Sequence, residues 1–326
     1  MNNFSVVIIG AGPAGIGAAA KLLKSGVESI TIIERSDKVG GIPSFYKKKK
    51  GGVRTFMRWS WGGVPVFGQD FAAWLEKQIA QTRVVLKLES LVLEIDAKAK
   101  SVTYVNSTEG KTTLSADAII LANGAREKNV AERKWVAGSR PSRVMFTKQL
   151  LSLETAAGLL PMKNPLVIGS DVIAYAAAAK LKKAGAADAV IVDNRQRPEC
   201  PIHERAYFGL FGKFPYRGSR ANSIEIKGTQ SAEGADFAGK ALDSDGVVVS
   251  GELVPNSELA LLGDLKVDIP SRIPVVGSDG QFPEPGWFIA GNVRGGFHGA
   301  EWCFFDGRRA ARAVLKNRDL LGNATS

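Results

Sequence analysis

The sequence is poor in cysteine and has no long hydrophobic segment. Two cysteines in 326 residues cannot build a disulfide framework, and they cannot hold an iron–sulfur cluster by themselves. The longest apolar runs, such as residues 6–9 and 118–122, are far too short to cross a bilayer. The first residues enter a predicted strand without the pattern of a signal peptide. We therefore expect a cytoplasmic protein with no transmembrane segment, and we predict no metal site.

The composition is that of an ordinary globular protein with an excess of positive charge. Apolar residues make up 45% and charged residues 23%, which excludes a disordered or fibrous chain, and the length favours two domains. The net charge is +11, and residues 38–69 hold seven basic residues and no acidic one. This loop could steer an anionic small-molecule substrate, a nucleotide or an acidic partner. For Lys47 to Lys50 alone we favour a solvated loop, and no motif supports nucleic-acid binding.

A strand–turn–helix–strand pattern occurs twice. The first copy covers residues 4–33 and the second covers residues 165–193, and each has a buried strand, a glycine turn and an alanine-rich helix. Such units build doubly wound parallel sheets. A late strand at 287–290 and a helix at 300–316 are assigned back to the first module.

The intervening sequence completes a fold prediction. Residues 70–82 form an amphipathic helix pattern, residues 116–121 a buried strand, and four short segments at 84–88, 91–96, 101–105 and 111–114 a small meander. We predict an α/β protein with two Rossmann-like, doubly wound, parallel-sheet domains, the second inserted in the first, and a small antiparallel meander. The expected domains are 1–125 with 251–326, which would bind a dinucleotide, and 126–250.

The first glycine turn carries a complete dinucleotide-binding fingerprint. Residues 10–15 read G-x-G-x-x-G directly after a strand and open a helix. Gly10 permits the tight turn, Gly12 lets the backbone approach a pyrophosphate, and Gly15 lets helix and strand pack closely. Glu34 ends the second strand, where a carboxylate can accept hydrogen bonds from a ribose. The pattern predicts a bound dinucleotide.

Three further glycine turns give the chain a family resemblance. They lie at residues 39–43, 116–124 and 287–293, and together with the first turn they resemble flavoproteins of the pyridine nucleotide–disulfide oxidoreductase and thioredoxin reductase superfamily. That superfamily has Thr where this chain has Asn123 and Asp where it has Asn292, and both replacements keep a hydrogen-bonding side chain. The resemblance implies FAD rather than NAD, bound by Gly10, Ala11, Gly12, Pro13, Ala14, Gly15, Glu34, Arg35, Gly40, Gly41, Ile42, Ala122, Asn123, Gly124, Gly291, Asn292, Gly299 and Ala300.

One branch of the superfamily is more similar than the rest. The segments at 40–43, 124–127, 138–141, 254–256 and 285–292 resemble the flavoprotein subunits of hydrogen cyanide synthase and opine oxidases. This resemblance implies an FAD-dependent oxidoreductase that is one component of a multi-subunit dehydrogenase or oxidase acting on an amine, an amino acid or a similar small substrate. Two alternatives stay open: an electron-transfer or assembly subunit without its own substrate site, and an NAD(P)H-dependent reductase of an electron carrier.

The second glycine turn keeps only the first glycine of its fingerprint. Asp171 stands where the second glycine would be, and its bulk and charge oppose a pyrophosphate, although Asp193 is placed like a ribose-binding carboxylate. We therefore do not expect NAD(P) to bind. Disulfide reduction needs two neighbouring thiols, whereas Cys200 and Cys303 lie in different predicted domains.

The loop before the last helix holds the proposed catalytic group. The resemblance implies that this helix points its N-terminus at the flavin, and His298 beside it could relay a proton. A loop histidine bonded to backbone is an equally good interpretation. We interpret Glu301 as a first-turn residue that complements the helix dipole, and His203 as structural. Trp59 and Trp61 could form one wall of the flavin site, or simply pack in a core.

Overall fold

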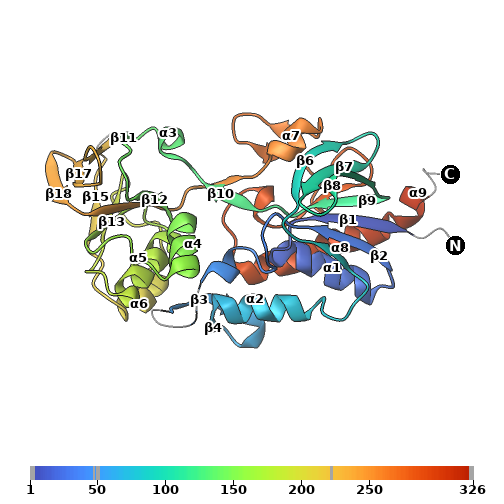
Figure 1. Ribbon diagram of the computed structural model, residues 1–326, viewed down its shortest axis with the longest axis horizontal. Helices are drawn as coiled ribbons and strands as arrows, with labels where there is room; N and C mark the ends of the chain where they lie inside the picture. Colours follow the sequence, from blue (N-terminus) through green and yellow to red (C-terminus); the bar gives the residue numbers. More distant parts are fainter. Residues whose placement is uncertain (1–3, 47, 49–51, 221–222, 323–326) are drawn as a thin grey trace. The chain divides into compact units, whose positions relative to one another are not determined.

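The computed structural model describes residues 4–46, 48, 52–220 and 223–322 (Figure 1). The chain divides into two compact units. Unit 1 comprises Met1–Ser44, Phe56–Arg126 and Leu253–Ser326, and unit 2 comprises Phe45–Thr55 and Glu127–Glu252. Most of unit 2 is thus inserted between two stretches of unit 1 in the sequence. Which unit binds which ligand stays a prediction.

Unit 1 is built on a five-stranded sheet in which all neighbouring strands are parallel. The order is β23-β9-β1-β2-β5. The strands are β1 (Ser5–Ile9), β2 (Ser29–Ile33), β5 (Val85–Lys87), β9 (Ala118–Leu121) and β23 (Trp287–Ile289). The late strand β23 pairs with β9, as its assignment to the first module predicts. Because the strands run parallel, their carboxyl ends meet at one edge, where such sheets bind ligands.

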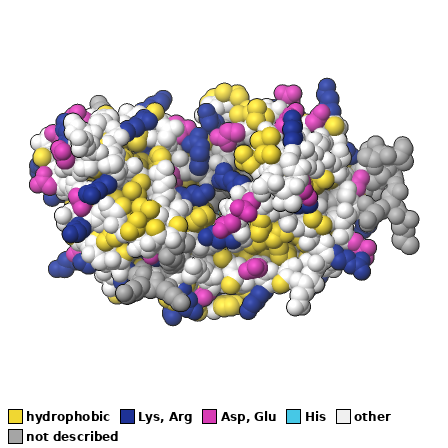
Figure 2. All heavy atoms as spheres, in the orientation of Figure 1, with side chains coloured by type: hydrophobic (Ala, Val, Ile, Leu, Met, Phe, Trp, Pro, Cys, Tyr) yellow, Lys and Arg dark blue, Asp and Glu magenta, His cyan; other side chains and the backbone are white. Residues whose placement is uncertain are grey.

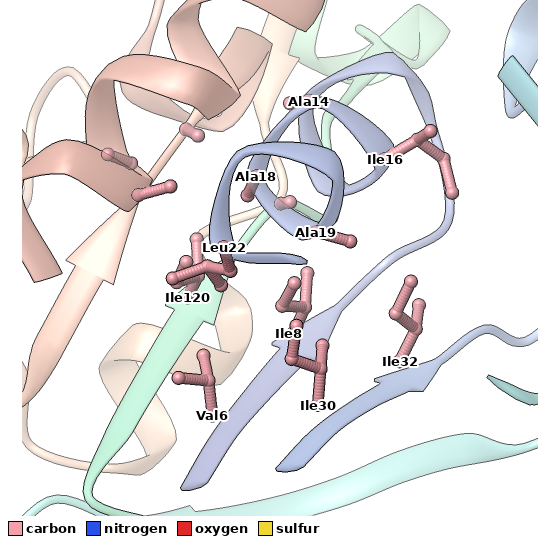
Figure 3. Close-up of a cluster of buried hydrophobic side chains, with 14 of the residues drawn as sticks. Val6, Ile8, Ala14, Ile16, Ala18, Ala19, Leu22, Ile30, Ile32 and Ile120 are labelled. Atoms are coloured by element: carbon pink, nitrogen blue, oxygen red, sulfur yellow. The ribbon is translucent and has the colours of Figure 1, made fainter. Parts of the chain in front are cut away.

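Helices α1 (Pro13–Lys24), α2 (Gly68–Lys77), α8 (Ala300–Lys316) and α9 (Arg318–Gly322) belong to unit 1. Figure 3 shows α1 lying over Ile8 of β1 and over Ile30 and Ile32 of β2, and these residues are buried in one core cluster with Ala14, Ala18 and Ala19 of the helix. Helix α8 crosses α1 so closely that neither crossing point has room for a side chain. A Cβ added at Gly17 would lie 2.0 Å from the Phe304 carbonyl oxygen, and one at Gly307 would lie 1.9 Å from that of Ala14.

The meander of unit 1 is smaller than the sequence predicts. Strands β6 (Leu91–Asp96), β7 (Ser101–Asn106) and β8 (Gly110–Ser115) form it, all antiparallel. The prediction that residues 84–88 belong to it is wrong, since β5 adds to the parallel sheet beside β2. A three-residue strand is too short to show a side-chain period from which its sheet could be predicted.

Short helices and strand pairs complete unit 1 and the stretches where the sequence passes from one unit to the other. They are η1 (Ile42–Phe45), η2 (Trp59–Trp61), η3 (Gly291–Arg294), α7 (Glu258–Leu262), and the strand pairs β3 (Arg54–Arg58) with β4 (Val64–Phe67), β10 (Ala125–Glu127) with β20 (Leu253–Pro255), and β21 (Val267–Asp268) with β22 (Ile273–Pro274).

Unit 2 repeats the doubly wound plan. Its parallel sheet has the order β12-β19-β13-β14-β15, made of β12 (Val144–Phe146), β13 (Pro165–Ile168), β14 (Val190–Asp193), β15 (Tyr216–Gly218) and β19 (Gly246–Val249). A second sheet contains β11 (Val136–Gly138), β16 (Ile224–Lys227), β17 (Gly234–Phe237) and β18 (Lys240–Asp243), and the helices are α3 (Val130–Arg133), α4 (Thr147–Ala157), α5 (Val172–Ala184) and α6 (Ile202–Gly209). The predicted fold class, with two Rossmann-like sheets and a meander, is confirmed.

The crossing of α1 and α8 generates a stability prediction. Gly307→Ala should lower the free energy of unfolding by about 3 kcal/mol, because the new methyl group meets the backbone of α1, which cannot rotate away. Thermal unfolding followed by circular dichroism measures the effect. Gly209→Ala is the matched control, since a Cβ there meets nothing within 4 Å, and its melting temperature should stay within a degree or two or rise slightly. Equal melting temperatures for both variants would contradict the close crossing.

Candidate functional site

The turn after β1 joins three strand ends of unit 1. Gly10 has φ +108°, and its N–H donates to the carbonyl oxygen of Ile33 at 2.8 Å. A Cβ at this position would lie 2.6 Å from the carbonyl oxygen of Ala122, so only glycine fits. A Cβ at Gly15 would lie 1.9 Å from the Gly10 carbonyl oxygen. The backbone of the turn therefore packs directly against the ends of β2 and β9.

The first turn of α1 presents backbone N–H groups beside two glycines. Gly12 is the N-cap and has no side chain with which to cap the helix, and the first turn holds no acidic residue. Gly41, with φ +59°, lies so close that an added Cβ would be 3.0 Å from the Gly12 Cα. Gly40 donates its N–H to the Ala11 carbonyl oxygen at 2.9 Å, which fixes this second loop on the first. A helix start of this kind favours an anion as its acceptor.

Glu34 is a buried carboxylate held by the backbone. Its Oε2 accepts from the N–H of Ala11 at 2.8 Å and its Oε1 from the N–H of Ser36 at 2.8 Å. Each oxygen has a second lone pair, so the fixed carboxylate can still accept hydrogen bonds from ribose hydroxyls. Arg35, the next residue, is exposed, and so is Ile42 beyond the glycine pair.

Asn123 links the end of β9 to a later segment. Its Nδ2 donates to the Asn256 carbonyl oxygen and the Nδ2 of Asn256 donates back to the Asn123 carbonyl oxygen, both at 2.8 Å. The Oδ1 of Asn123 is buried and has no hydrogen-bond partner among the described residues. A buried acceptor without a donor is costly unless a ligand or water supplies one.

A second asparagine organises the loop before α8. The Oδ1 of Asn292 accepts from the His298 N–H at 3.0 Å, and its Nδ2 donates to the His298 carbonyl oxygen at 3.2 Å. Gly291 donates its N–H to Asp306 at 2.7 Å. The N-cap of α8 is Gly299, which again has no capping side chain. The segment thus closes on itself and leaves the start of α8 to backbone N–H groups.

His298 lies at the start of α8 with its ring stacked on Trp302, 3.7 Å between ring centroids. Burial lowers the pKa of His298 below its ordinary value, Asp306 opposes this and Arg294 adds to it. The imidazole is therefore neutral at neutral pH, which is the form that can accept a proton. Its role as a proton relay stays a prediction.

Glu301 has more structure around it than the sequence indicates. Glu301 lies in the first turn of α8, as interpreted, but it is also buried, with its Oε1 3.0 Å from the Nε of Arg58 and Ser60 donating to it. Arg58 in turn lies between two rings, 3.8 Å from the Trp74 centroid and 4.1 Å from that of Trp61. This ion pair fastens η2 to the start of α8.

The tryptophans of η2 are exposed rather than part of a core. Trp59 and Trp61 expose 69% and 58% of their surface. His203, in unit 2, is also exposed. Lys47, Lys49 and Lys50 of the lysine run lie outside the described residues. The structure therefore does not test the prediction about that run.

The second glycine turn, in unit 2, is closed by its own carboxylate. Asp171 is the N-cap of α5, and its Oδ1 accepts from the Ala174 N–H at 3.0 Å. Burial raises the pKa of Asp171 to about 6. A Cβ added at Gly251 would lie only 2.2 Å from the Oδ2 of Asp171, so this carboxylate occupies the space beside the glycine. Asp193 is fully buried and accepts from the Ser170 hydroxyl and the Arg195 side chain.

The two thiols are both buried, one in each unit. Burial is the main cause that raises the pKa of Cys200 and of Cys303 to about 12. Both are therefore protonated at neutral pH and poor nucleophiles. The part of the chain that the structure describes contains no cluster of metal-ligating side chains and no helix long and apolar enough to cross a membrane.

Comparison with known proteins identifies the class. Residues 4–311 match the model of the pyridine nucleotide-disulphide oxidoreductase family, and the chain belongs to this family of FAD-dependent oxidoreductases. The resemblance found in the four glycine turns is thereby confirmed.

The relatives include the predicted branch. The chain is 25% identical to an opine oxidase subunit of Rhizobium meliloti over 96% of its own length and 62% of the relative's. It is 24% identical to the corresponding opine oxidase subunit of Agrobacterium tumefaciens, over 99% and 67%. It is 24% identical to hydrogen cyanide synthase subunit HcnB of Pseudomonas protegens, over 97% and 71%. The chain thus spans about two thirds of the length of these relatives.

Solved structures share the fold. Thioredoxin reductase of T. acidophilum superposes with a TM-score of 0.76 at 21% identity, over 98% of this chain and all of that one. Thioredoxin reductase of Lactococcus lactis gives 0.72 at 19% identity, over 96% and 98%.

The Arg58–Glu301 pair generates a pH-dependent prediction. Burial opposes the charge of Glu301, but hydrogen bonds from Ser60, Trp59 and Arg58 outweigh it, so its folded pKa lies below the ordinary 4.5. The stabilisation is then complete above pH 4.5 and is lost as the pH falls through the folded pKa. Glu301→Gln should cost about 3 kcal/mol at pH 7, because Arg58 stays buried without its counter-charge.

Urea unfolding of wild type and variant at pH 7 and at pH 3 measures this. The difference between them should shrink at the lower pH, and Glu94→Gln, at an exposed position, should differ from wild type at neither pH. A Glu301→Gln deficit that is the same at both pH values would contradict an ionised Glu301 in the folded state.

Proposed function

We propose that the chain is the FAD-bearing subunit of a dehydrogenase or oxidase that acts on an amine, an amino acid or a similar small substrate. The observation that carries the proposal is the start of α1, where glycine backbone from two loops surrounds N–H groups that Gly12 cannot cap. Among the relatives are subunits of opine oxidase and the alpha subunit of sarcosine oxidase, and their names support both the substrate class and the role within a complex.

The residues of unit 1 fit FAD by their chemistry. The N–H groups after Gly12 would bind the pyrophosphate, and Glu34 would accept from the adenosine ribose. The unpaired Oδ1 of Asn123 is an acceptor that a bound group would satisfy. The other proposed contacts are Gly10, Ala11, Pro13, Ala14, Gly15, Arg35, Gly40, Gly41, Ile42, Ala122, Gly124, Gly291, Asn292, Gly299 and Ala300.

FAD supplies a two-electron acceptor when it is bound. The chain contributes the positive end of the α8 dipole, which favours negative charge near Gly299 and Ala300. His298, neutral because its pKa is lowered, would hold or move a proton at its imidazole. The substrate would be small, and the excess of positive charge would favour an anionic one.

We propose that unit 2 binds no NAD(P), because Asp171 already supplies the acceptor that a pyrophosphate would supply in the first unit. Buried thiols with raised pKa likewise argue against a disulfide reductase. We also propose that the protein is cytoplasmic and that it assembles with partner subunits.

A second candidate function is an NAD(P)H-dependent reductase. One observation favours it: Arg195 lies beside Asp193, where a cation can accommodate a nucleotide phosphate. Relatives named rhodocoxin reductase and glutamate synthase [NADPH] small chain point the same way. The Asp171 cap opposes this second function, because a bound nucleotide would require the aspartate side chain to leave the start of α5. An electron-transfer or assembly subunit without a substrate site is the remaining alternative.

Gly12→Asp should separate folding from FAD binding. The new carboxylate can cap α1 as Asp171 caps α5, and an added Cβ meets Gly41 only at 3.9 Å, so the variant should fold. The same carboxylate repels a pyrophosphate, so the purified variant should contain less than about a tenth of the wild-type FAD. Absorbance at 450 nm and circular dichroism measure the two properties. Gly209→Asp is the control, and a folded Gly12→Asp variant that keeps full FAD would overturn the assignment.

Neither NADH nor NADPH should reduce the bound flavin rapidly. Anaerobic mixing with each nucleotide at micromolar concentration, followed at 450 nm in a stopped-flow instrument, measures the rate. The expected trace stays flat over seconds, while dithionite bleaches the same sample and shows that its flavin is reducible. Rapid bleaching by either nucleotide would favour the reductase instead.

A further inference from the structure

The start of α8 and the neighbouring η2 expose four large aromatic side chains. Trp302 and Phe305 expose 42% and 44% of their surface, and Trp59 and Trp61 expose more than half of theirs. The two elements touch, because Ser60, between the tryptophans, donates to Glu301, beside Trp302. We call Trp59, Trp61, Trp302 and Phe305 the aromatic patch. Clustered exposed aromatics mark interaction sites more often than single ones do.

Packed side chains support the patch from beneath. Arg58 and Glu301 form an ion pair that joins η2 to α8, and the guanidinium of Arg58 lies over the rings of both Trp61 and Trp74. Phe304, in the core, packs edge-on against Phe305, with 5.6 Å between the centroids. Aromatic side chains that are already fixed lose little entropy when a partner covers them.

The exposed charge that α8 carries beyond the patch is of one sign. The outward face of α8 continues past Phe305 with Arg308, then Arg312 and Lys316, the last two exposed. Helix α8 contains two carboxylates, Glu301 and Asp306, and both are buried in ion pairs. The outward face of α8 is therefore aromatic at its start and cationic toward its end, and it exposes no carboxylate of α8. Figure 2 shows hydrophobic side chains at the surface of the face drawn, among side chains of both charges.

We propose that the aromatic patch, together with Arg308, Arg312 and Lys316, is the docking surface for a different protein chain of the same oxidoreductase complex. The matching surface would be apolar and bordered by Asp and Glu. This inference rests on the proposed function as one component of a complex. In a symmetric pair of copies this face would meet itself and its cations would repel one another, because the same helix face carries no exposed carboxylate.

The experiment uses the full chain, tagged and expressed in the cells that make it. Phe305 is replaced by the photoreactive p-benzoylphenylalanine, and Leu93, equally exposed on β6, is replaced in a control. After irradiation, mass spectrometry should find a cross-link from position 305 to an Asp- or Glu-rich segment of a different chain, and none from position 93. A cross-link to a second copy, or no cross-link from 305, overturns the proposal.

Charge reversal tests the cationic half. Arg308→Glu with Arg312→Glu should reduce the co-purified cross-linked chain about tenfold. Lys98→Glu with Lys111→Glu makes the same charge change at exposed positions of the meander and should leave recovery unchanged. Equal loss in both double variants would overturn the proposed surface.

FAD content separates this proposal from the one on which it rests. All four variants should keep wild-type absorbance at 450 nm, since none replaces a proposed FAD contact. A wild-type chain that carries no FAD would refute the proposed function. A chain that carries FAD and co-purifies with a different chain, yet forms no cross-link from position 305, would refute the docking surface alone.

Discussion

The N–H groups that begin a helix need an acceptor, and the two units of this chain meet that need differently. In unit 1 the position is Gly12, and Gly41 brings a second stretch of bare backbone to the same place. In unit 2 the corresponding position is Asp171, whose carboxylate accepts from the helix itself. One residue thus decides whether the helix start is open to an external anion or satisfied internally, and the proposed roles of the units follow from it.

The remaining site geometry depends on contacts that support this open turn. Glu34 is fixed by the N–H of Ala11 within the turn, so the proposed ribose acceptor and the proposed pyrophosphate site are positioned by the same backbone. On α8, the Arg58–Glu301 pair fixes the start of a second helix whose N-cap, Gly299, also lacks a side chain. Unit 1 therefore presents two helix starts to anionic groups, one toward the pyrophosphate and one toward the flavin in the proposed binding mode.

The fold and the outline of the site could be predicted because their signals are local. A buried strand, a glycine turn and an alanine-rich helix follow one another within residues 4–33. The order of the glycine turns along the whole chain then relates the sequence to a family. The Arg58–Glu301 pair could not be predicted, since its members are 243 residues apart and nothing in either neighbourhood specifies the other. The same holds for the paired amides of Asn123 and Asn256, and for β5, whose sheet depends on tertiary placement.

Counting the nucleotides that the chain retains tests the central claim most directly. The purified protein is dialysed against excess NADH and NADPH, freed of unbound nucleotide and denatured, and the released nucleotides are quantified by chromatography. An open first turn and a closed second turn predict one FAD per chain and no pyridine nucleotide. A chain that releases one NADH or NADPH alongside its FAD, or that retains no FAD, would contradict the assignment of an open site to Gly12 and a closed one to Asp171.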